Sequence, residues 1–174
     1  GGITNTFSFK GVELSALIDV RKGGQILSWS KYDQMTKGTG KFTERRDNLI
    51  AEGVIEQPDG KFLPSDKKLL SQDYYAMRGW GNIGEEFVID ADYVALREVS
   101  IGYNIGMLLK KTSLRSARLS VVGRNLLYLY RDPQFKLMGI SPETAFNTSA
   151  AAQGYETRGV PTTRSIGFNL SFSF

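Results

Sequence analysis

The last eleven residues, 164–174, most constrain what this chain can fold into. They read RSIGFNLSFSF, with large apolar side chains on one side of an extended strand and small polar residues or glycine on the other. The apolar side comprises Ile166, Phe168, Leu170, Phe172 and Phe174. A strand of a soluble sheet usually turns its apolar side inward and charged side chains outward. Aromatic side chains opposite small polar ones favour a membrane strand with lipid outside and a polar lumen inside.

The same alternation recurs in four earlier segments, so we predict five strands in an all-β, antiparallel transmembrane β-barrel segment. The expected strands span residues 3–10, 12–21, 93–105, 116–130 and 164–174. Gly11 allows a tight turn between the first two strands. The alternation blurs at Leu126-Leu127, which indicates a bulge or a wide aromatic girdle.

The predicted connections are alternately short and long, and the long ones span residues 22–92 and 131–163. Outer-membrane barrels have short periplasmic turns and long extracellular loops. We therefore expect both long loops outside and the C-terminus on the periplasmic side. Within the first loop, residues 26–37 and 65–77 could be helical.

Five strands cannot close a barrel by themselves, because single-chain membrane barrels have eight strands or more. An open edge would leave backbone groups unpaired in hydrocarbon. The chain also opens on Gly1-Gly2, without an initiator Met or signal peptide. We therefore expect either the end of a larger barrel or one chain of a multi-chain pore.

Composition excludes several classes of function. The sequence has no Cys and no His, which excludes disulfides, thiol nucleophiles and His-based metal or acid–base sites. The net charge is only +4, and no basic tract suggests a nucleic-acid partner. No run of eighteen apolar residues predicts a transmembrane helix. Because no catalytic constellation is present either, we expect that the protein is not an enzyme.

Four segments, in order, resemble strands of the SusC/RagA-type TonB-dependent transporters of Bacteroidota. They are TNTFSFKGVELSALIDVRKGG, YVALREVSIGYNIG, SARLSVVGRNLLYLYR and PTTRSIGFNLSFSF. The resemblance covers nearly all the strand segments and is weakest in the loops. The chain departs from the family at Ile105-Gly106, where Leu-Pro is frequent, and at Gly123-Arg124-Asn125, where Gly-Gln-Asn is usual. Neither departure alters the alternation.

The resemblance implies a fold, a function and partners. The family forms 22-stranded outer-membrane barrels with an N-terminal plug and imports oligosaccharides or peptides with energy from TonB. A SusD-like surface lipoprotein usually acts as a lid. This chain would supply the last five strands and two external loops, in contact with the rest of the barrel, the plug and outer-membrane lipid. The plug and the TonB-contacting segment would lie upstream of Gly1.

The apolar strand faces predict which residues contact lipid. The expected lipid-facing set is Ile18, Val20, Val99, Ile101, Leu119, Val121, Phe168, Leu170 and Phe172. The terminal strand also resembles the signal by which the outer-membrane assembly machinery recognises barrels, carried by Phe168, Phe172 and Phe174. The opposite faces should line the lumen and pair across strands or against the plug. They carry Glu13, Asp19, Arg21, Glu98, Arg118 and Arg124.

Aromatic residues of the first long loop are candidates for ligand binding, because sugar rings stack on aromatic faces. The candidates are Trp80, Tyr74 and Tyr75. The alternative is that these residues, with Trp29 and Tyr32, pack the loop against itself or lie in the membrane girdle. The Asp90-Ala91-Asp92 segment could offer oxygen ligands to Ca²⁺ but falls short of a calcium loop. We therefore expect no cofactor.

A function from another class also fits part of the sequence. A soluble β-rich glycan-binding module would have strands and loop aromatics of the same kind. It would be monodisperse without detergent, whereas the apolar faces of the predicted strands favour the membrane.

Overall fold

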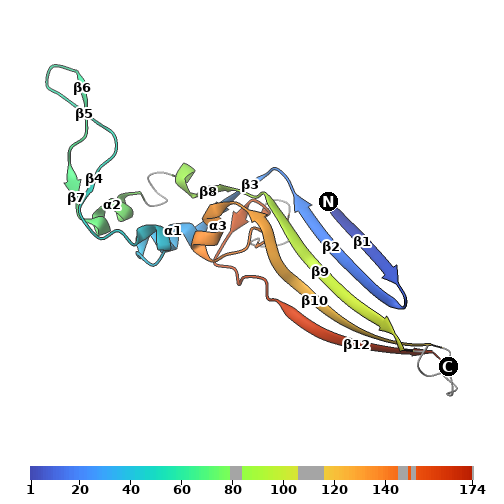
Figure 1. Ribbon diagram of the computed structural model, residues 1–174. Coiled ribbons are helices and arrows are strands. Elements are labelled where there is room, and N and C mark those ends of the chain that lie inside the picture. The colour runs from blue at the N-terminus through green and yellow to red at the C-terminus, as the bar shows by residue number, and fades with distance from the viewer. Residues whose placement is uncertain (79–83, 106–115, 145–148, 150–151, 174) are drawn as a thin grey trace. The chain divides into compact units, whose positions relative to one another are not determined.

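The computed structural model describes residues 1–78, 84–105, 116–144, 149 and 152–173. It divides into two compact units (Figure 1). The sheet unit comprises residues 1–24, 91–132 and 161–174, and the loop unit comprises residues 25–90 and 133–160. Each unit therefore contains segments that lie far apart in the sequence.

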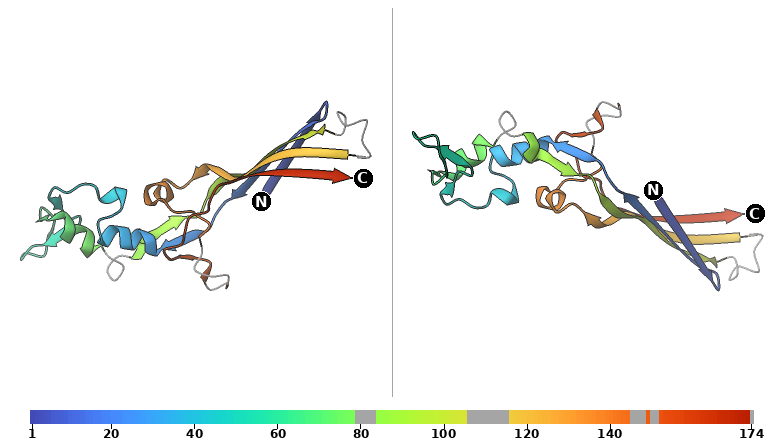
Figure 2. Two further views of the ribbon diagram at one scale, coloured as in Figure 1. Left: turned by 90° about the horizontal axis from the view of Figure 1, so that it is seen from below. Right: turned by 90° about the horizontal axis from the view of Figure 1, so that it is seen from above.

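The sheet unit is a single five-stranded antiparallel sheet in the order β1-β2-β9-β10-β12. Its strands are β1 Gly2–Phe9, β2 Val12–Arg21, β9 Tyr93–Asn104, β10 Ser116–Arg131 and β12 Ser165–Ser173. In Figure 2 these strands form one layer whose strand direction turns from β1 to β12, as is usual for β-sheets. The antiparallel all-β fold class predicted from the sequence is confirmed, and the sheet does not close into a barrel.

Lys10 and Gly11 form the turn between β1 and β2. Both residues have positive φ, 47° and 82°, which is the conformation of the two-residue hairpin turns that match strand twist. Pairing of Phe9 with Val12 closes the hairpin directly across this turn. Both long connections start and return at the end of the sheet that is far from this turn, because β2 and β10 end where β9 and β12 begin.

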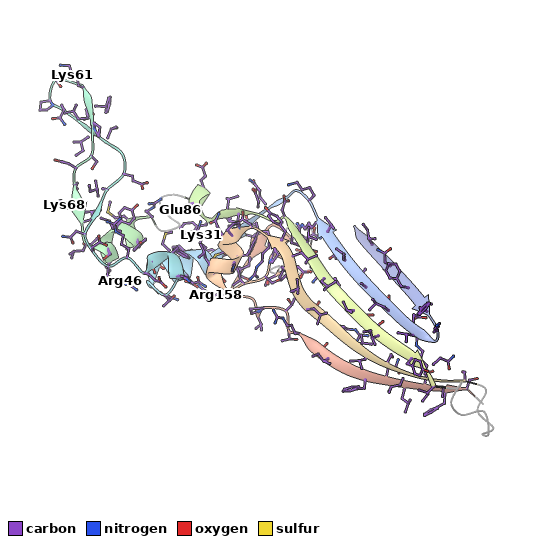
Figure 3. All side chains as sticks on the ribbon, in the orientation of Figure 1. Lys31, Arg46, Lys61, Lys68, Glu86 and Arg158 are labelled. Atoms are coloured by element: carbon purple, nitrogen blue, oxygen red, sulfur yellow. The ribbon has the colours of Figure 1, made fainter. Side chains whose placement is uncertain are left out.

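The two faces of the sheet differ in chemistry, and the register keeps each face consistent. Leu14 lies opposite Ile101, and Val121 lies between Ile101 and Phe168. These residues and their neighbours two positions along form an apolar face, on which Phe168 is 79% exposed. Side chains project from both faces of the strands in Figure 3. Among the described residues of the sheet unit, no second layer covers either face.

Bulges interrupt the register without mixing the two faces. The pairing of β10 with β9 shifts between Arg124 and Leu127, where Asn125 has a φ of 50°. Asn tolerates this left-handed conformation better than most residues. The bulge predicted at Leu126-Leu127 is therefore present. A second shift, opposite Leu17 and Ile18 of β2, leaves Arg97 of β9 as the extra residue.

The loop unit contains short helices and short paired strands. The first long connection holds β3 Gln25–Ser28, α1 Trp29–Thr36, the 3₁₀ helix η1 Lys41–Thr43, β4 Leu49–Ile50, β5 Val54–Glu56, β6 Phe62–Pro64, β7 Lys68–Leu69, α2 Ser71–Met77, the 3₁₀ helix η2 Gly84–Phe87 and β8 Val88–Asp90. The second holds α3 Pro133–Met138 and β11 Tyr155–Glu156. Strand β3 pairs with β8 and with β11, so the two connections share one small sheet.

Both helices expected in the first connection are shorter than predicted. The segment 26–37 begins as a strand, because Ile26 and Leu27 pair with β8 before Ser28 caps α1 by accepting a hydrogen bond from the Lys31 N–H. The segment 65–77 is helical only over α2, because β7 pairs with β4. Tertiary pairing thus overrides the local pattern in both places.

The core of the loop unit is small and apolar. Phe87 and Phe135 are fully buried, and Ile26 and Ile89 are nearly so. Tyr32 of α1 packs edge-on against Phe87, with 5.7 Å between ring centroids, and Trp29 packs against Tyr32 in turn. These two aromatics therefore pack the loop against itself. Within the described residues, no helix is long and apolar enough to cross a membrane.

Candidate functional site: a polar sheet face and a loop pocket

Ion pairs link the strands across the polar face of the sheet. Arg118 of β10 pairs with Glu13 of β2, and Arg124 of β10 pairs with Glu98 of β9 at 2.9 Å. The cross-strand pairing predicted for these four residues is therefore present. Because they are partly exposed, each pair contributes little net stability, and their main effect is to hold polar side chains in fixed positions.

Gly102 leaves room for one of these pairs. A Cβ atom at this position would lie 2.8 Å from the Arg118 guanidinium, so the guanidinium would have to move. Gly102 is paired with Glu13 on β2 and with Ser120 on β10. The absence of a side chain therefore lets Arg118 cross β9 to reach Glu13.

A cluster of charged and aromatic residues lies on the same face, at the end of the sheet where the long connections begin. Arg97, the bulge residue, donates to Asp19 at 3.0 and 3.1 Å, and the Tyr93 hydroxyl donates to the same carboxylate at 2.9 Å. Arg97 also stacks on the Tyr93 ring, which packs edge-on against Tyr128. Arg131 stacks on the Tyr128 ring. The bulge thus aims an additional arginine at the polar face.

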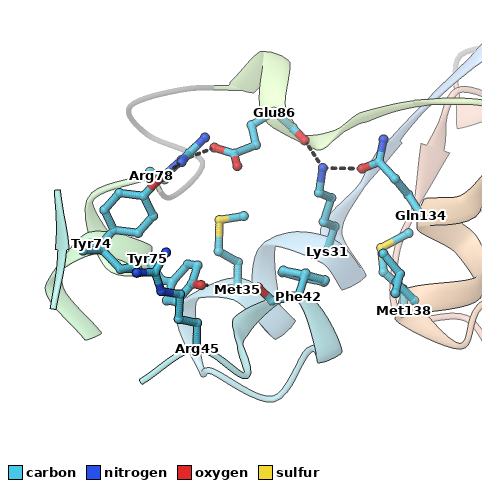
Figure 4. Close-up of a pocket in the computed structure, with 12 residues that line it drawn as sticks. Lys31, Met35, Phe42, Arg45, Tyr74, Tyr75, Arg78, Glu86, Gln134 and Met138 are labelled. Atoms are coloured by element: carbon cyan, nitrogen blue, oxygen red, sulfur yellow. Dashed lines mark hydrogen bonds and ion pairs between the residues drawn. The ribbon is translucent and has the colours of Figure 1, made fainter. Parts of the chain in front are cut away.

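The loop unit contains a pocket of about 380 Å³, built from both long connections (Figure 4). Its apolar lining consists of Met35, Phe42, Leu49, Tyr74, Tyr75, Leu137 and Met138, and its polar lining consists of Lys31, Arg45, Arg78, Glu86 and Gln134. Volumes of this size, with an apolar lining and a few polar groups, are typical of small-ligand sites.

The two tyrosines of α2 form one wall of the pocket. Their rings pack edge-on, with 5.3 Å between centroids. The Tyr75 hydroxyl donates to the Phe42 carbonyl at 3.3 Å, and the Tyr74 hydroxyl accepts from Arg78. Burial raises the pKa of Tyr74, so this hydroxyl stays neutral at physiological pH. The wall is thus an aromatic surface with fixed orientation.

Cationic side chains also line the pocket, and Arg78 lies beside the tyrosine wall, whereas Lys31 lies across the pocket from it (Figure 4). Arg78 pairs with Glu86 at 2.7 Å and stacks on Tyr74. Burial lowers the pKa of Arg78, but the hydrogen bond and charge of Glu86 outweigh this effect and raise the pKa above its ordinary value. Lys31 donates to the Glu86 carbonyl and to Gln134 Oε1, the latter at 2.5 Å. Lys31 therefore ties η2 to α3 across the pocket.

A buried carboxylate fastens the second connection to the first. Glu156 is fully buried and accepts from the hydroxyls of Ser28 and Ser30 at 2.6 Å each. It also accepts from the backbone N–H groups of Ser30 and Gly159, at 3.2 and 3.3 Å. These bonds place the carboxylate at the N-terminus of α1, where negative charge is favoured. The two long connections that form the pocket are therefore held together by these hydrogen bonds.

Ion pairs support this junction at the surface. Arg158 pairs with Asp33 of α1, and Lys37 pairs with the same carboxylate at 3.4 Å. The hydrogen bond from Arg158 holds the pKa of Asp33 below its ordinary value, with a smaller contribution from Lys37. Asp33 is therefore charged at neutral pH and holds the chain that follows Glu156.

The structure brings together two of the three ligand-binding candidates. Tyr74 and Tyr75 line the pocket, whereas Trp80 lies outside the described residues, as does Phe174 of the predicted assembly signal. Phe168 and Phe172 share the apolar face of β12. Ligand binding and assembly roles stay predictions.

The acidic residues considered for Ca²⁺ have other partners. Asp92 accepts from Lys22 and from the Gly23 N–H at 2.5 Å, and these bonds hold its pKa below the ordinary value. Asp90 accepts from the Gln25 side chain at 3.5 Å. Within the part of the chain that the structure describes, no group of three or more acidic residues is placed to hold a metal ion. The expectation of no cofactor stays a prediction.

Sequence reasoning missed the cations of the pocket. Lys31, Arg45 and Arg78 come from three separate segments, and no local pattern places them together. The only local signals were the Tyr74-Tyr75 pair and the turn residues around it.

Comparison with known proteins finds similarity in sequence to a TonB-dependent receptor. The sequence is 25% identical over 181 residues to the TonB-dependent receptor P3 of Formosa agariphila, in a match that covers 99% of this chain and 16% of that receptor. No protein-family profile matches the chain.

Solved structures of the RagAB peptide importer are similar in fold. The closed-closed state matches with a TM-score of 0.59 and 14% identity, over 100% of this chain and 17% of that chain. The open-open state matches with a TM-score of 0.56 and 16% identity, over the same shares. This chain therefore spans less than a fifth of the proteins that it matches.

The fold is that of a segment of the RagA barrel. The chain is SusC/RagA-like, because it is similar to part of a TonB-dependent receptor in sequence and to part of the RagAB importer in fold, which confirms the resemblance found in its strand motifs. Such barrels belong in the outer membrane, as expected from the sequence. The similar proteins are a receptor and importers, in agreement with the expectation that this chain is not an enzyme.

Proposed function

We propose that this chain forms part of the wall and external loops of an outer-membrane importer of peptides or oligosaccharides, driven by TonB. The apolar face of the sheet contacts lipid, and the polar face lines the lumen or contacts the plug. The loop unit lies outside the cell and offers Tyr74 and Tyr75 to the ligand. The C-terminus lies on the periplasmic side.

One observation carries this proposal: the sheet has a continuous apolar face that none of the described residues of its own unit covers. Ile101, Val121 and Phe168 lie side by side on three neighbouring strands and are 55%, 38% and 79% exposed. Exposed apolar areas of this kind mark an interaction surface. A membrane is a suitable environment for such a face, because apolar side chains pack against the hydrocarbon chains of the lipid. The similarity to a TonB-dependent receptor supports the energy source.

Uptake by cells that carry the full-length transporter tests this function. Mixed oligopeptides and oligosaccharides with an isotope label should accumulate in cells with the transporter and an active TonB. Accumulation should fall to the background of a transporter deletion when TonB is removed. Equal accumulation with and without TonB would overturn the energy source, and no accumulation of either class would overturn the import function.

We further propose that the β5–β6 hairpin contacts a SusD-like surface lipoprotein. The two strands pair with each other, with Ile55 opposite Leu63 and Glu56 opposite Phe62. Phe62 and Leu63 are 62% and 52% exposed. An isolated two-stranded hairpin is only marginally stable in water, so a partner that covers its apolar side chains would order it.

Double replacement of Phe62 and Leu63 by Ser should reduce recovery of the lipoprotein with the affinity-tagged, full-length transporter by about tenfold. The apolar contact is lost, while the barrel strands are unchanged. Lys61→Ser is the matched control, because Lys61 lies in the adjacent turn and its side chain is 78% exposed (Figure 3). Equal recovery of the lipoprotein with both variants would exclude the hairpin as its contact.

A further inference from the structure

The loop pocket has an excess of positive charge in its lining. Lys31, Arg45 and Arg78 line it, against one carboxylate, Glu86. The Glu86 carboxylate accepts from Arg78 at 2.7 Å. A neutral sugar would find the carboxylate already paired with Arg78, whereas an anion would meet three cationic side chains.

Arg45 is the cation best placed to meet a ligand. It donates from Nε and Nη2 to Asp47, at 2.8 to 2.9 Å. Both side chains of this pair are more than half exposed, at 66% and 58%, and exposed pairs contribute little stability. Arg45 can therefore exchange Asp47 for a ligand carboxylate at small cost, and a guanidinium binds a carboxylate through two parallel hydrogen bonds.

The inner part of the pocket suits an apolar group. Met35 and Met138 are 3% and 6% exposed and present thioethers, which adapt to irregular ligand shapes. Tyr75 adds aromatic surface beside Arg45, and Phe42 adds more near Met35 (Figure 4). A ring or aliphatic side chain fits here, with its carboxylate directed to the rim.

We propose that this pocket binds an organic anion in which a carboxylate adjoins an apolar group. The carboxyl-terminal residue of a peptide and a free aryl carboxylic acid share this chemistry. The inference rests on the proposed function, because it names the class of ligand that the external loops take.

Binding is measured by calorimetry on the full-length transporter, purified in detergent, with matched probes. N-acetyl-Ala-Phe carries the free carboxylate, and N-acetyl-Ala-Phe amide lacks it. The acid should bind about tenfold more tightly than the amide, the order of one charge-assisted hydrogen bond. 3-Phenylpropanoate distinguishes the two ligand classes. If it binds more weakly than N-acetyl-Ala-Phe, the ligand is the carboxyl terminus of a peptide. If it binds equally well, the ligand is a free acid.

Arg45→Gln should weaken binding of the acid by about tenfold and leave binding of the amide unchanged. Arg45→Lys, which keeps the charge, should retain most of the preference. Arg46→Gln is the control, because Arg46 is the next residue and does not line this pocket. Unchanged binding of the amide also shows that the pocket is still folded.

Equal affinity for acid and amide in the unaltered protein would overturn the inference, as would an effect of Arg46→Gln as large as that of Arg45→Gln. TonB-dependent uptake, measured in cells that carry the same variants, distinguishes failure of the anion pocket from failure of the proposed import function. Uptake that persists without any preference for the acid overturns the anion pocket alone. Preference for the acid without TonB-dependent uptake overturns the proposed function and keeps the pocket.

Discussion

Arginine in place of Phe168 should destabilise the full-length barrel by about 2–4 kcal/mol, the cost of this side chain on the lipid face near the midplane. Phe168 lies in the middle of β12, opposite Val121, and is 79% exposed on the apolar face. The measurement is equilibrium unfolding in urea of the barrel in lipid vesicles. Fewer folded barrels should also accumulate in the outer membrane.

Asn169→Arg provides the matched control for this prediction. Asn169 is the next residue on the same strand and lies opposite Ser120, on the polar face. On this face, which we propose lines the lumen, arginine meets water and should change the unfolding free energy by less than about 1 kcal/mol. If both substitutions destabilise the barrel equally, the apolar face does not contact lipid and the soluble alternative regains support.

Period-2 alternation predicted the sheet well because it is a local signal. Each strand of the sheet unit carries its own pattern, and a one-residue shift would exchange the two faces. The Arg97 bulge shows the limit of this reasoning. Nothing in the sequence around Arg97 marks an extra residue, and its position follows from pairing with β2, about eighty residues away.

The loop unit could not be predicted in the same way, because its contacts join distant segments. Lys31 meets Gln134, and Ser28 meets Glu156, with separations of 103 and 128 residues. No periodic pattern encodes such pairs. The Tyr74-Tyr75 pair was visible as a candidate, but its pocket depends on Lys31, Arg45 and Gln134, which only the folded chain brings to it.

Glu156→Ala should loosen the loop unit strongly, by on the order of 3 kcal/mol. The substitution removes a fully buried carboxylate with four hydrogen bonds and leaves the donors of Ser28, Ser30 and Gly159 without it. Buried donors that lose their acceptor cost about 1–3 kcal/mol each. Amide hydrogen exchange in β3 and α1 should accelerate by roughly a hundredfold, because local opening becomes easier by that energy.

The strands of the sheet unit serve as an internal reference in the same exchange experiment. Among the described residues, the hydrogen bonds of Glu156 lie within the loop unit. Glu85→Ala is the matched control, since Glu85 is an exposed glutamate of the same unit. Glu156→Gln should give an intermediate effect, because the amide keeps one acceptor oxygen and its nitrogen cannot accept from the one backbone N–H, of Ser30 or of Gly159, that it would face. If Glu156→Ala leaves exchange in α1 unchanged, the carboxylate does not hold the two connections together. The pocket would then lack the fixed frame on which selective binding depends.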